Sequence, residues 1–149
     1  MPVNVADIFE QLYDKNNSKA YKALLALQKE SEASDKVYPY MDRLSGMLDS
    51  DNSYIRTRGL TLLSYNSRWD IDFKMDEIID KYLRHITDTS PITARQCIKS
   101  LPRIAGNKPD LKNDILGALH RADVSCYDDS MRPLVQKDIQ KAMKEIQTL

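Results

Sequence analysis

Residues 40–56 read YMDRLSGMLDSDNSYIR, and residues 79–95, IDKYLRHITDTSPITAR, repeat their pattern 39 positions later. In both segments, apolar residues at helical spacing lead into a polar turn, and a second helix begins after that turn. The aligned positions pair Leu44 with Leu83, Met47 with Ile86, Asp49 with Asp88 and Arg56 with Arg95. Self-similarity at a fixed period of this size predicts a stack of helical hairpins.

Weaker copies of the same pattern extend the repeat to the rest of the chain. Residues 18–32 match the second helix of the quoted segment, and residues 119–146 supply a further copy. Ser90 followed by Pro91 is a typical helix start, with a serine cap and a proline at the first helical position. The sequence therefore predicts one all-α domain, residues 1–149, made of about four hairpins over residues 3–32, 37–68, 72–106 and 109–148.

The repeated residues resemble the motif of HEAT-like (HEAT/armadillo-type) helical repeat proteins. The residues that correspond to the motif are Asp49, Ile55 and Arg56 in one copy, and Asp88, Ala94 and Arg95 in the next. The resemblance covers nearly the whole chain and implies a right-handed α-α superhelix, that is, a short solenoid. It further implies that the turn aspartate caps the second helix, and that the arginine bridges to the neighbouring hairpin.

Two prolines depart from this family pattern. Pro133 directly follows the arginine of the third copy, and Pro102 lies inside a helix that family members usually keep intact. An interior proline removes one backbone hydrogen bond, so we expect a kink there. We expect Gly59 to let two helices approach closely. An irregular helical bundle, which obeys the same packing rules, is the alternative fold.

Composition excludes several classes of protein. Hydrophobic residues make up 42% of the chain and charged residues 30%, so it can form a core and is not typical of a disordered tail. No apolar run approaches the roughly 20 residues that span a bilayer. Two cysteines, Cys97 and Cys126, do not make a disulfide framework, and we expect Cys97 to be a buried thiol. The N-terminal residues show no signal peptide, and we expect a cytoplasmic protein.

A net charge of zero gives no global attraction to nucleic acid or to membrane, but it hides a segregation of charge. The four expected second helices, residues 18–32, 53–68, 91–106 and 131–149, contain 13 basic and 4 acidic residues, a surplus of nine. Because second helices line the concave face in HEAT-like proteins, the resemblance implies a basic concave face. The candidate binding residues on it are Lys22, Lys29, Tyr54, Arg58, Tyr65, Arg68, Trp69, Lys99 and Arg103.

The same charges also have a structural interpretation. Basic residues stabilise the C-terminal ends of helices, and aspartates cap the N-terminal ends. We expect a structural role in the repeat for Asp49, Arg56, Gly59, Asp88 and Arg95.

The sequence contains no recognisable catalytic constellation. His85 and His120 are its only histidines and are expected on the surface, and no His/Cys cluster or Gly-rich phosphate loop is present. We therefore expect no catalytic residues, no metal and no cofactor. These features favour a non-catalytic adaptor that binds an acidic protein or peptide on the basic face.

Nucleic-acid binding is the alternative, because lysines and arginines interleaved with aromatic residues suit phosphate contacts and base stacking. Some DNA glycosylases that act on alkylated bases are built from HEAT-like repeats and use a basic groove with aromatic residues and one acid. Tyr65, Arg68, Trp69 and Asp70 would be the nearest equivalents here, by analogy of fold alone. A carboxylate aimed into the basic face would favour the glycosylase, and an apolar pocket would favour a peptide. The oligomeric state is left open, and self-association is a third alternative.

Overall fold

The computed structural model describes residues 4–149, and every regular element in that range is helical. The α-helices are α1 (Val5–Glu10), α2 (Asn17–Ala33), α3 (Met41–Met47), α4 (Ser53–Asn66), α5 (Lys74–Leu83), α6 (Pro91–Asn107), α7 (Lys112–Arg121) and α8 (Arg132–Gln147). Short 3-10 helices adjoin them: η1 (Gln11–Tyr13), η2 (Tyr38–Tyr40), η3 (Ser67–Trp69), η4 (Arg84–Thr87) and η5 (Pro109–Leu111). The predicted all-α class is thus confirmed for this range, while the expected start of the first hairpin, residue 3, lies outside it.

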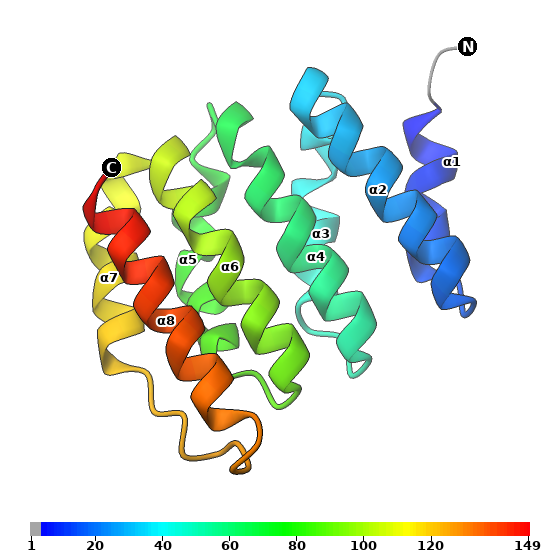
Figure 1. Ribbon diagram of the computed structural model, residues 1–149. Helices are drawn as coiled ribbons and strands as arrows, with labels where there is room; N and C mark the ends of the chain where they lie inside the picture. The colour runs from blue at the N-terminus through cyan, green and yellow to red at the C-terminus, as the bar shows by residue number, and fades with distance from the viewer. Residues whose placement is uncertain (1–3) are drawn as a thin grey trace.

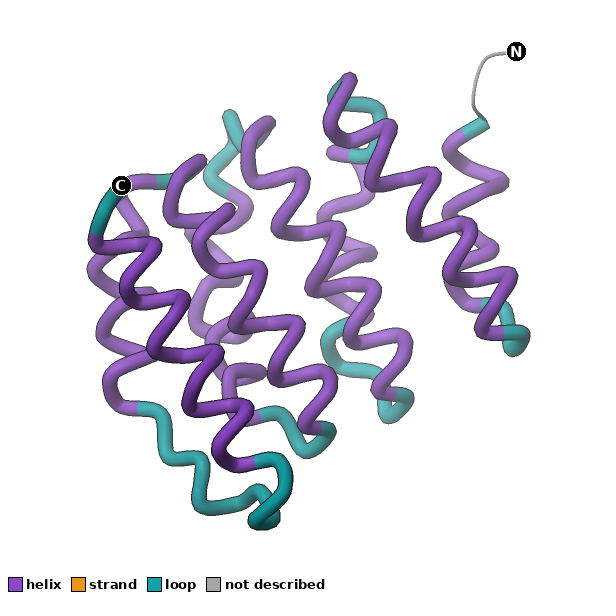
Figure 2. Tube along the Cα trace, in the orientation of Figure 1, coloured by secondary structure: helices purple, strands orange, loops and turns teal. Residues whose placement is uncertain are grey.

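The helices form two layers. Figure 1 shows α2, α4, α6 and α8 side by side in the layer nearer the viewer, with α1, α3, α5 and α7 behind them. Neighbours in the front layer are in contact, and α3 packs on α4. Figure 2 shows the loops gathered at the two ends of the layers, so the side chains at the middle of the front layer come from helices alone.

Helix starts follow side-chain caps that the local sequence supplies. Ser90 caps α6 as predicted, because its hydroxyl accepts a hydrogen bond from the amide of Thr93 at 3.4 Å. Asn52 caps α4, accepting from the amide of Tyr54 at 2.9 Å. Asp49 therefore does not have the capping role that the family resemblance implied. Its exposed carboxylate instead lies 2.6 Å from the ammonium of Lys81 on α5. Helix α6 continues through Pro102 to Asn107.

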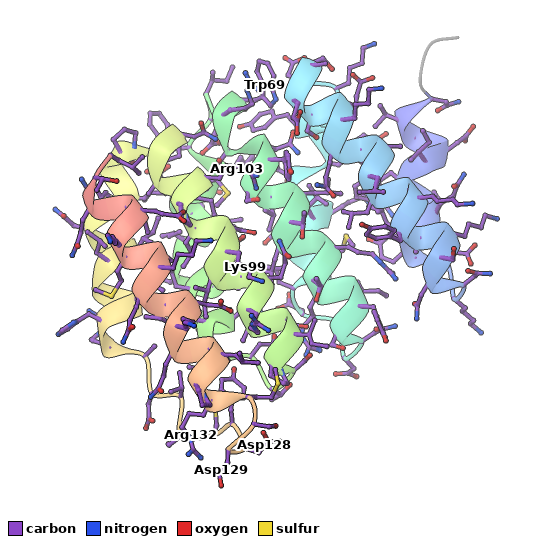
Figure 3. The ribbon with its side chains drawn as sticks, in the orientation of Figure 1. Trp69, Lys99, Arg103, Asp128, Asp129 and Arg132 are labelled. Atoms are coloured by element: carbon purple, nitrogen blue, oxygen red, sulfur yellow. The ribbon has the colours of Figure 1, made fainter. Side chains whose placement is uncertain are left out.

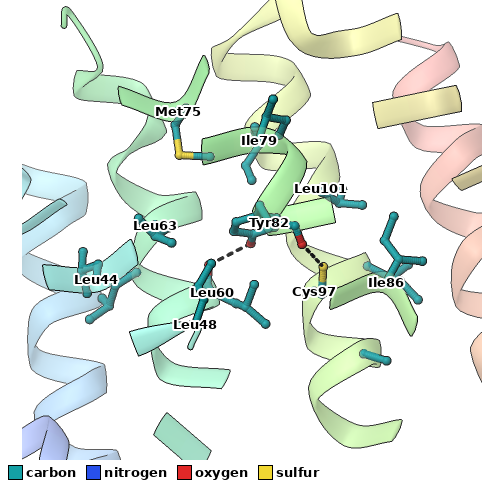
Figure 4. Packing of buried hydrophobic residues seen from close by; sticks show 14 of the residues in the cluster. Leu44, Leu48, Leu60, Leu63, Met75, Ile79, Tyr82, Ile86, Cys97 and Leu101 are labelled. Atoms are coloured by element: carbon teal, nitrogen blue, oxygen red, sulfur yellow. Dashed lines mark hydrogen bonds between the residues drawn. The ribbon is translucent and has the colours of Figure 1, made fainter. Parts of the chain in front are cut away.

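The core lies between the two layers and is one continuous cluster of apolar side chains. Tyr82 is among its largest fully buried residues, and its hydroxyl donates to the carbonyl of Leu60 at 2.8 Å, which ties α5 to α4 (Figure 4). The thiol of Cys97 lies 3.6 Å from the carbonyl oxygen of Tyr82. Cys97 is fully buried, as expected, and burial raises the pKa of its thiol well above the ordinary value.

A buried ion pair joins α4 to the turn that precedes α6. The guanidinium of Arg56 donates to both carboxylate oxygens of Asp88, at 2.7 and 3.0 Å, and the Asp88 side chain is only 3% exposed. His85 is half-buried rather than on the surface, with its Nδ1 atom 2.6 Å from the same carboxylate. Burial opposes ionisation of Asp88, but hydrogen bonds from His85, Arg56 and the Ser90 amide outweigh it and hold the Asp88 pKa well below its usual range.

A second arginine, at the equivalent position of the repeat, connects α6 to α8. Arg95 on α6 donates from its Nε atom to the carboxylate of Asp138 on α8 at 2.6 Å. Arg56 therefore links α4 to the turn before α6, and Arg95 links α6 to α8. No helix of residues 4–149 is long and apolar enough to cross a membrane.

The contact between α3 and α4 at Gly59 yields a stability prediction. A Cβ atom at Gly59 would lie 2.9 Å from the Cβ atom of Met47 and 3.1 Å from the carbonyl oxygen of Leu44, neither of which can move without shifting α3. Gly59→Leu should therefore lower the free energy of unfolding by about 1–3 kcal/mol. Gly46→Leu is the matched control, because nothing lies within 4 Å of a Cβ there. Equal urea midpoints for the two variants would contradict the close approach of α3 to α4 at Gly59.

The Arg56–Asp88 pair should make stability depend on pH with a definite sign. Because the folded protein lowers the Asp88 pKa, the stabilisation is complete above the unfolded carboxyl value of about 3.9 and is lost as pH falls through the lower folded value. Asp88→Asn should lower stability near neutral pH and weaken the loss of stability below about pH 4. Urea unfolding across that range measures both effects. Asp49→Asn, at an exposed ion pair, serves as control and should retain the acid sensitivity of the unaltered protein.

Candidate functional site

A groove opens on the solvent side of the front layer, above α4 and between α2 and α6. Its volume is 460 Å³. Helix α2 contributes Asn17, Tyr21, Leu24, Leu25 and Gln28; α4 contributes Tyr54, Thr57, Arg58 and Thr61; and α6 contributes Ile92 and Gln96. No acidic residue lines it. The groove is therefore a mainly apolar trough that contains one cationic side chain.

The groove exists because small and large side chains alternate across the three helices. Thr57 and Thr61 are one helical turn apart on α4 and form a low floor. Tyr21 and Leu25, also one turn apart, stand beside them on α2, and Ile92 stands on the α6 side. These three apolar residues are exposed, Ile92 by 71%. Clustered exposed apolar side chains mark interaction sites more often than isolated ones do.

Arg58 lies in the groove, but it is not the exposed side chain expected of a binding residue on the basic face. It is only 5% exposed, and its guanidinium donates to the carbonyl of Leu12 at 2.8 Å and to the side-chain oxygen of Asn17 at 3.2 Å. Burial lowers the pKa of Arg58. Its long side chain crosses from α4 to η1 and the start of α2, so it both joins these elements and lies beneath the groove.

The remaining basic candidates are exposed on the same three helices or at the end of α4. Figure 3 shows Lys99 and Arg103 on the front of α6. On α2, Leu25 falls three residues after Lys22 and four before Lys29, so both lysines share the outer helix face with a residue that lines the groove. Within residues 4–149, no carboxylate lies within ion-pair distance of any of the six basic candidates, Lys22, Lys29, Arg58, Arg68, Lys99 and Arg103.

The aromatic candidates divide into two kinds. Tyr54 is 58% exposed and lines the groove. Tyr65 is covered by the guanidinium of Arg103, whose central carbon lies 3.9 Å from the ring centroid. Trp69 is covered in the same way by Arg68, at 4.7 Å, and its indole nitrogen donates to the carbonyl of Ser31. The protein's own arginines thus cover one face of each of these two rings.

Asp70 does not face the groove. Its carboxylate accepts hydrogen bonds from the amides of Lys74 and Met75, at 2.7 and 2.9 Å, and from the hydroxyl of Tyr38 at 2.9 Å. The ammonium of Lys108 lies 3.2 Å away. The carboxylate is fully buried and fixes the start of α5 against η2 and the end of α6. The constellation of Tyr65, Arg68, Trp69 and Asp70 therefore does not form a single site.

No protein-family model, curated protein or solved structure matches this chain. Its site is accordingly defined by the chemistry of its own residues. Across residues 4–149, no group of three or more His, Cys, Asp or Glu side chains is placed to hold a metal ion.

Sequence reasoning missed the apolar part of the groove. Tyr21, Leu25 and Ile92 lie outside the core-facing stripes of their helices, and single apolar residues of this kind are common on protein surfaces. One local signal was present, because Tyr21 and Leu25 are spaced by four residues and give α2 a second apolar face. The contribution of Ile92, almost 70 residues further along, is visible only in the folded arrangement.

The buried position of Asp70 leads to a test of its structural role. Asp70→Ala should lower the free energy of unfolding by about 3 kcal/mol, because it leaves the amides at the start of α5 unpaired and removes one counter-ion of Lys108. Asp72→Ala is the matched control, since the exposed Asp72 carboxylate accepts from the same Tyr38 hydroxyl. Thermal and urea unfolding compare the two variants. An unchanged midpoint for Asp70→Ala would contradict this role.

Proposed function

We propose that this protein is a non-catalytic binding module that holds an acidic segment of a partner protein in the groove between α2, α4 and α6. The observation that supports this most directly is the lining of the groove, where exposed Tyr21, Leu25, Tyr54 and Ile92 surround a floor without any acidic residue. An apolar trough of 460 Å³ accommodates a few large side chains of a peptide. Helix-lined grooves are a common way to bind such segments.

Charge complementarity defines the partner further. Lys22 and Lys29 lie along the α2 side of the groove, and Lys99 and Arg103 lie along α6. None of them is within ion-pair distance of a carboxylate of residues 4–149. A segment that places large apolar side chains in the trough and Asp or Glu residues outside it would satisfy both surfaces. Electrostatic attraction of this kind raises the association rate and disfavours basic partners.

The same face is less suited to nucleic acid. Base stacking needs open aromatic faces, and Arg103 and Arg68 cover faces of Tyr65 and Trp69. Base excision would need a carboxylate in the groove, whereas Asp70 is buried elsewhere with four hydrogen-bonding or ionic partners. These observations favour a peptide over nucleic acid as the occupant.

We further propose that the two layers form a short right-handed superhelix of four HEAT-like hairpins. Support comes from the repeat of residues 40–56 at 79–95, and from the two arginines at equivalent repeat positions: Arg56 bonds to the turn before α6, and Arg95 bonds to α8. A face built from stacked hairpins would present a continuous surface to an extended partner.

Selection from a displayed library of random peptides tests the function. The unaltered protein should enrich sequences that combine Asp or Glu with large apolar residues. Ile92→Glu places a negative charge on the groove wall at a solvent-exposed position. It should lower the affinity for the selected peptides about tenfold or more while leaving the fold intact. Fluorescence anisotropy with labelled peptides gives the affinities.

Ile71→Glu is the matched control, because Ile71 is 84% exposed and does not line the groove. It should bind the selected peptides as the unaltered protein does. The proposal fails if no peptide is enriched, or if both variants bind equally well. It also fails if labelled single-stranded or duplex DNA binds instead, with a steep loss of affinity as salt is raised.

A further inference from the structure

Two arginines on the same helix have opposite electrostatic surroundings. Arg56 and Arg58 are two residues apart on α4, and both side chains are largely removed from solvent. Arg56 pairs with the buried carboxylate of Asp88 through two hydrogen bonds. Arg58 has only neutral partners in residues 4–149, the Leu12 carbonyl and the Asn17 amide oxygen. The protein therefore compensates one buried positive charge and leaves the other uncompensated.

The uncompensated charge has an energetic consequence. A guanidinium has five N–H donors, and a buried charge is costly unless it is paired and hydrogen-bonded. The two hydrogen bonds of Arg58 satisfy some donors but do not neutralise its charge. Burial accordingly lowers the pKa of Arg58, whereas the hydrogen bonds that Arg56 donates to Asp88 outweigh burial and raise the pKa of Arg56. A carboxylate that reached Arg58 would gain a charge-assisted bond in a place where water does not screen it fully.

The groove is the route by which such a carboxylate would arrive. Arg58 is one of its lining residues, beside Tyr54, whose ring centroid lies 5.9 Å from the guanidinium carbon. Tyr21 and Leu25 border the same groove, so an anion at Arg58 would have apolar side chains next to it. The chemistry that fits is a carboxylate with an apolar group close by in the same ligand.

Resting on the proposed function, we propose that Arg58 is the specificity-determining residue of the groove and pairs with an Asp or Glu side chain of the bound segment. The large apolar side chain next to that acid occupies the trough beside Tyr21, Leu25 and Ile92. The planar guanidinium suits a carboxylate because it can donate two parallel hydrogen bonds to it.

The acid belongs to the interior of the segment rather than to its C-terminus. A second hollow of 150 Å³ adjoins the groove and shares Thr57, Ile92 and Gln96 with it, so the surface continues along α6 beyond the groove. Lys99 lines this continuation. A chain that passes over Arg58 can therefore extend further and place a second acid at Lys99, which a chain ending at Arg58 would not do.

A small probe tests the role of Arg58 without knowledge of the partner. 4-Phenylbutyrate joins a carboxylate to an aromatic ring, and 4-phenylbutanamide is its neutral counterpart. Two-dimensional NMR should show both compounds shifting the ring signals of Tyr21 and Tyr54. The carboxylate should also shift the Nε–Hε signal of Arg58 and bind about tenfold more tightly than the amide. Equal affinity of the two compounds, or no shift of these signals with either, overturns the inference.

Two variants test whether the preference for the carboxylate over the amide depends on Arg58. Arg58→Met should bind the acid and the amide equally, while Arg103→Met, which removes an exposed arginine on the same face, should keep the preference. Loss of the preference in Arg103→Met and its retention in Arg58→Met would overturn the assignment. Thermal unfolding checks that both variants fold, and the comparison of acid with amide on the unaltered protein stands without them.

The outcome for Arg58 is separable from that for the groove. Peptides selected by the unaltered protein can be remade with each Asp changed to Asn and each Glu to Gln. One outcome is that the remade peptides bind the unaltered protein about as tightly as the original peptides do, with Ile92→Glu still lowering their affinity. In that case the groove is a peptide site, but Arg58 does not recognise an acid of the peptide. If one such change lowers the affinity for the unaltered protein about tenfold and leaves the affinity for Arg58→Met unchanged, that acid of the peptide interacts with Arg58 as proposed.

Discussion

The spacing of the front helices depends on the hydrogen bonds and ion pairs that join each neighbouring pair. Helices α4 and α6 are joined along their length, by the Arg56–Asp88 ion pair near one end, by the hydroxyls of Thr57 and Thr93 at 2.9 Å, and by Asn107 and Ser67 at 3.0 Å near the other. This set of contacts brings α6 onto α4 and also ties in the loop before α8, because the Tyr127 hydroxyl donates to the Asp88 carbonyl at 2.6 Å. The floor of the groove and one of its walls are held as one unit by these contacts.

Helices α2 and α4 are joined by a different pattern of polar contacts. Arg58 reaches Asn17 at the start of α2, and Asn66 donates to Ser31 near its end at 3.1 Å. The side chains between these contacts, Tyr21 and Leu25 on α2 and Thr61 on α4, line the groove instead of closing it. The groove thus lies between two polar contacts, with the small Thr61 on its α4 side and the larger Tyr21 and Leu25 on its α2 side. Arg58, Asn66 and Ser31, which make these contacts, are themselves buried, and this limits how far the spacing of α2 and α4 changes on binding.

Local sequence patterns predicted the helices and part of their connection, but not the surroundings of each side chain. The repeat at 79–95 placed Arg56 and Arg95 at equivalent positions; Arg56 bridges to the turn before α6, and Arg95 bridges to α8. The prediction that Asp49 caps α4 was wrong because its turn contains several residues able to do so, and Asn52 is the one that does. The prediction for Arg58 as an exposed residue was wrong for another reason. A helical register gives the direction of a side chain but not its neighbours, and the carbonyl that Arg58 meets belongs to Leu12, 46 residues earlier.

The arrangement of cations on this face also bears on how a partner would be discriminated. Arg103 is stacked on Tyr65 and bonded to the Ser64 hydroxyl at 3.3 Å, and Arg68 is stacked on Trp69 and bonded to the Glu32 carbonyl at 2.9 Å. These guanidinium groups are held in place before any ligand arrives, so less side-chain entropy is lost when an acid binds them. Lys22 and Lys29 have no such support and contribute mainly long-range attraction. A partner would then be attracted by many charges, but Arg58 alone lies within the apolar trough, where it would distinguish an acid that stands next to a large apolar side chain.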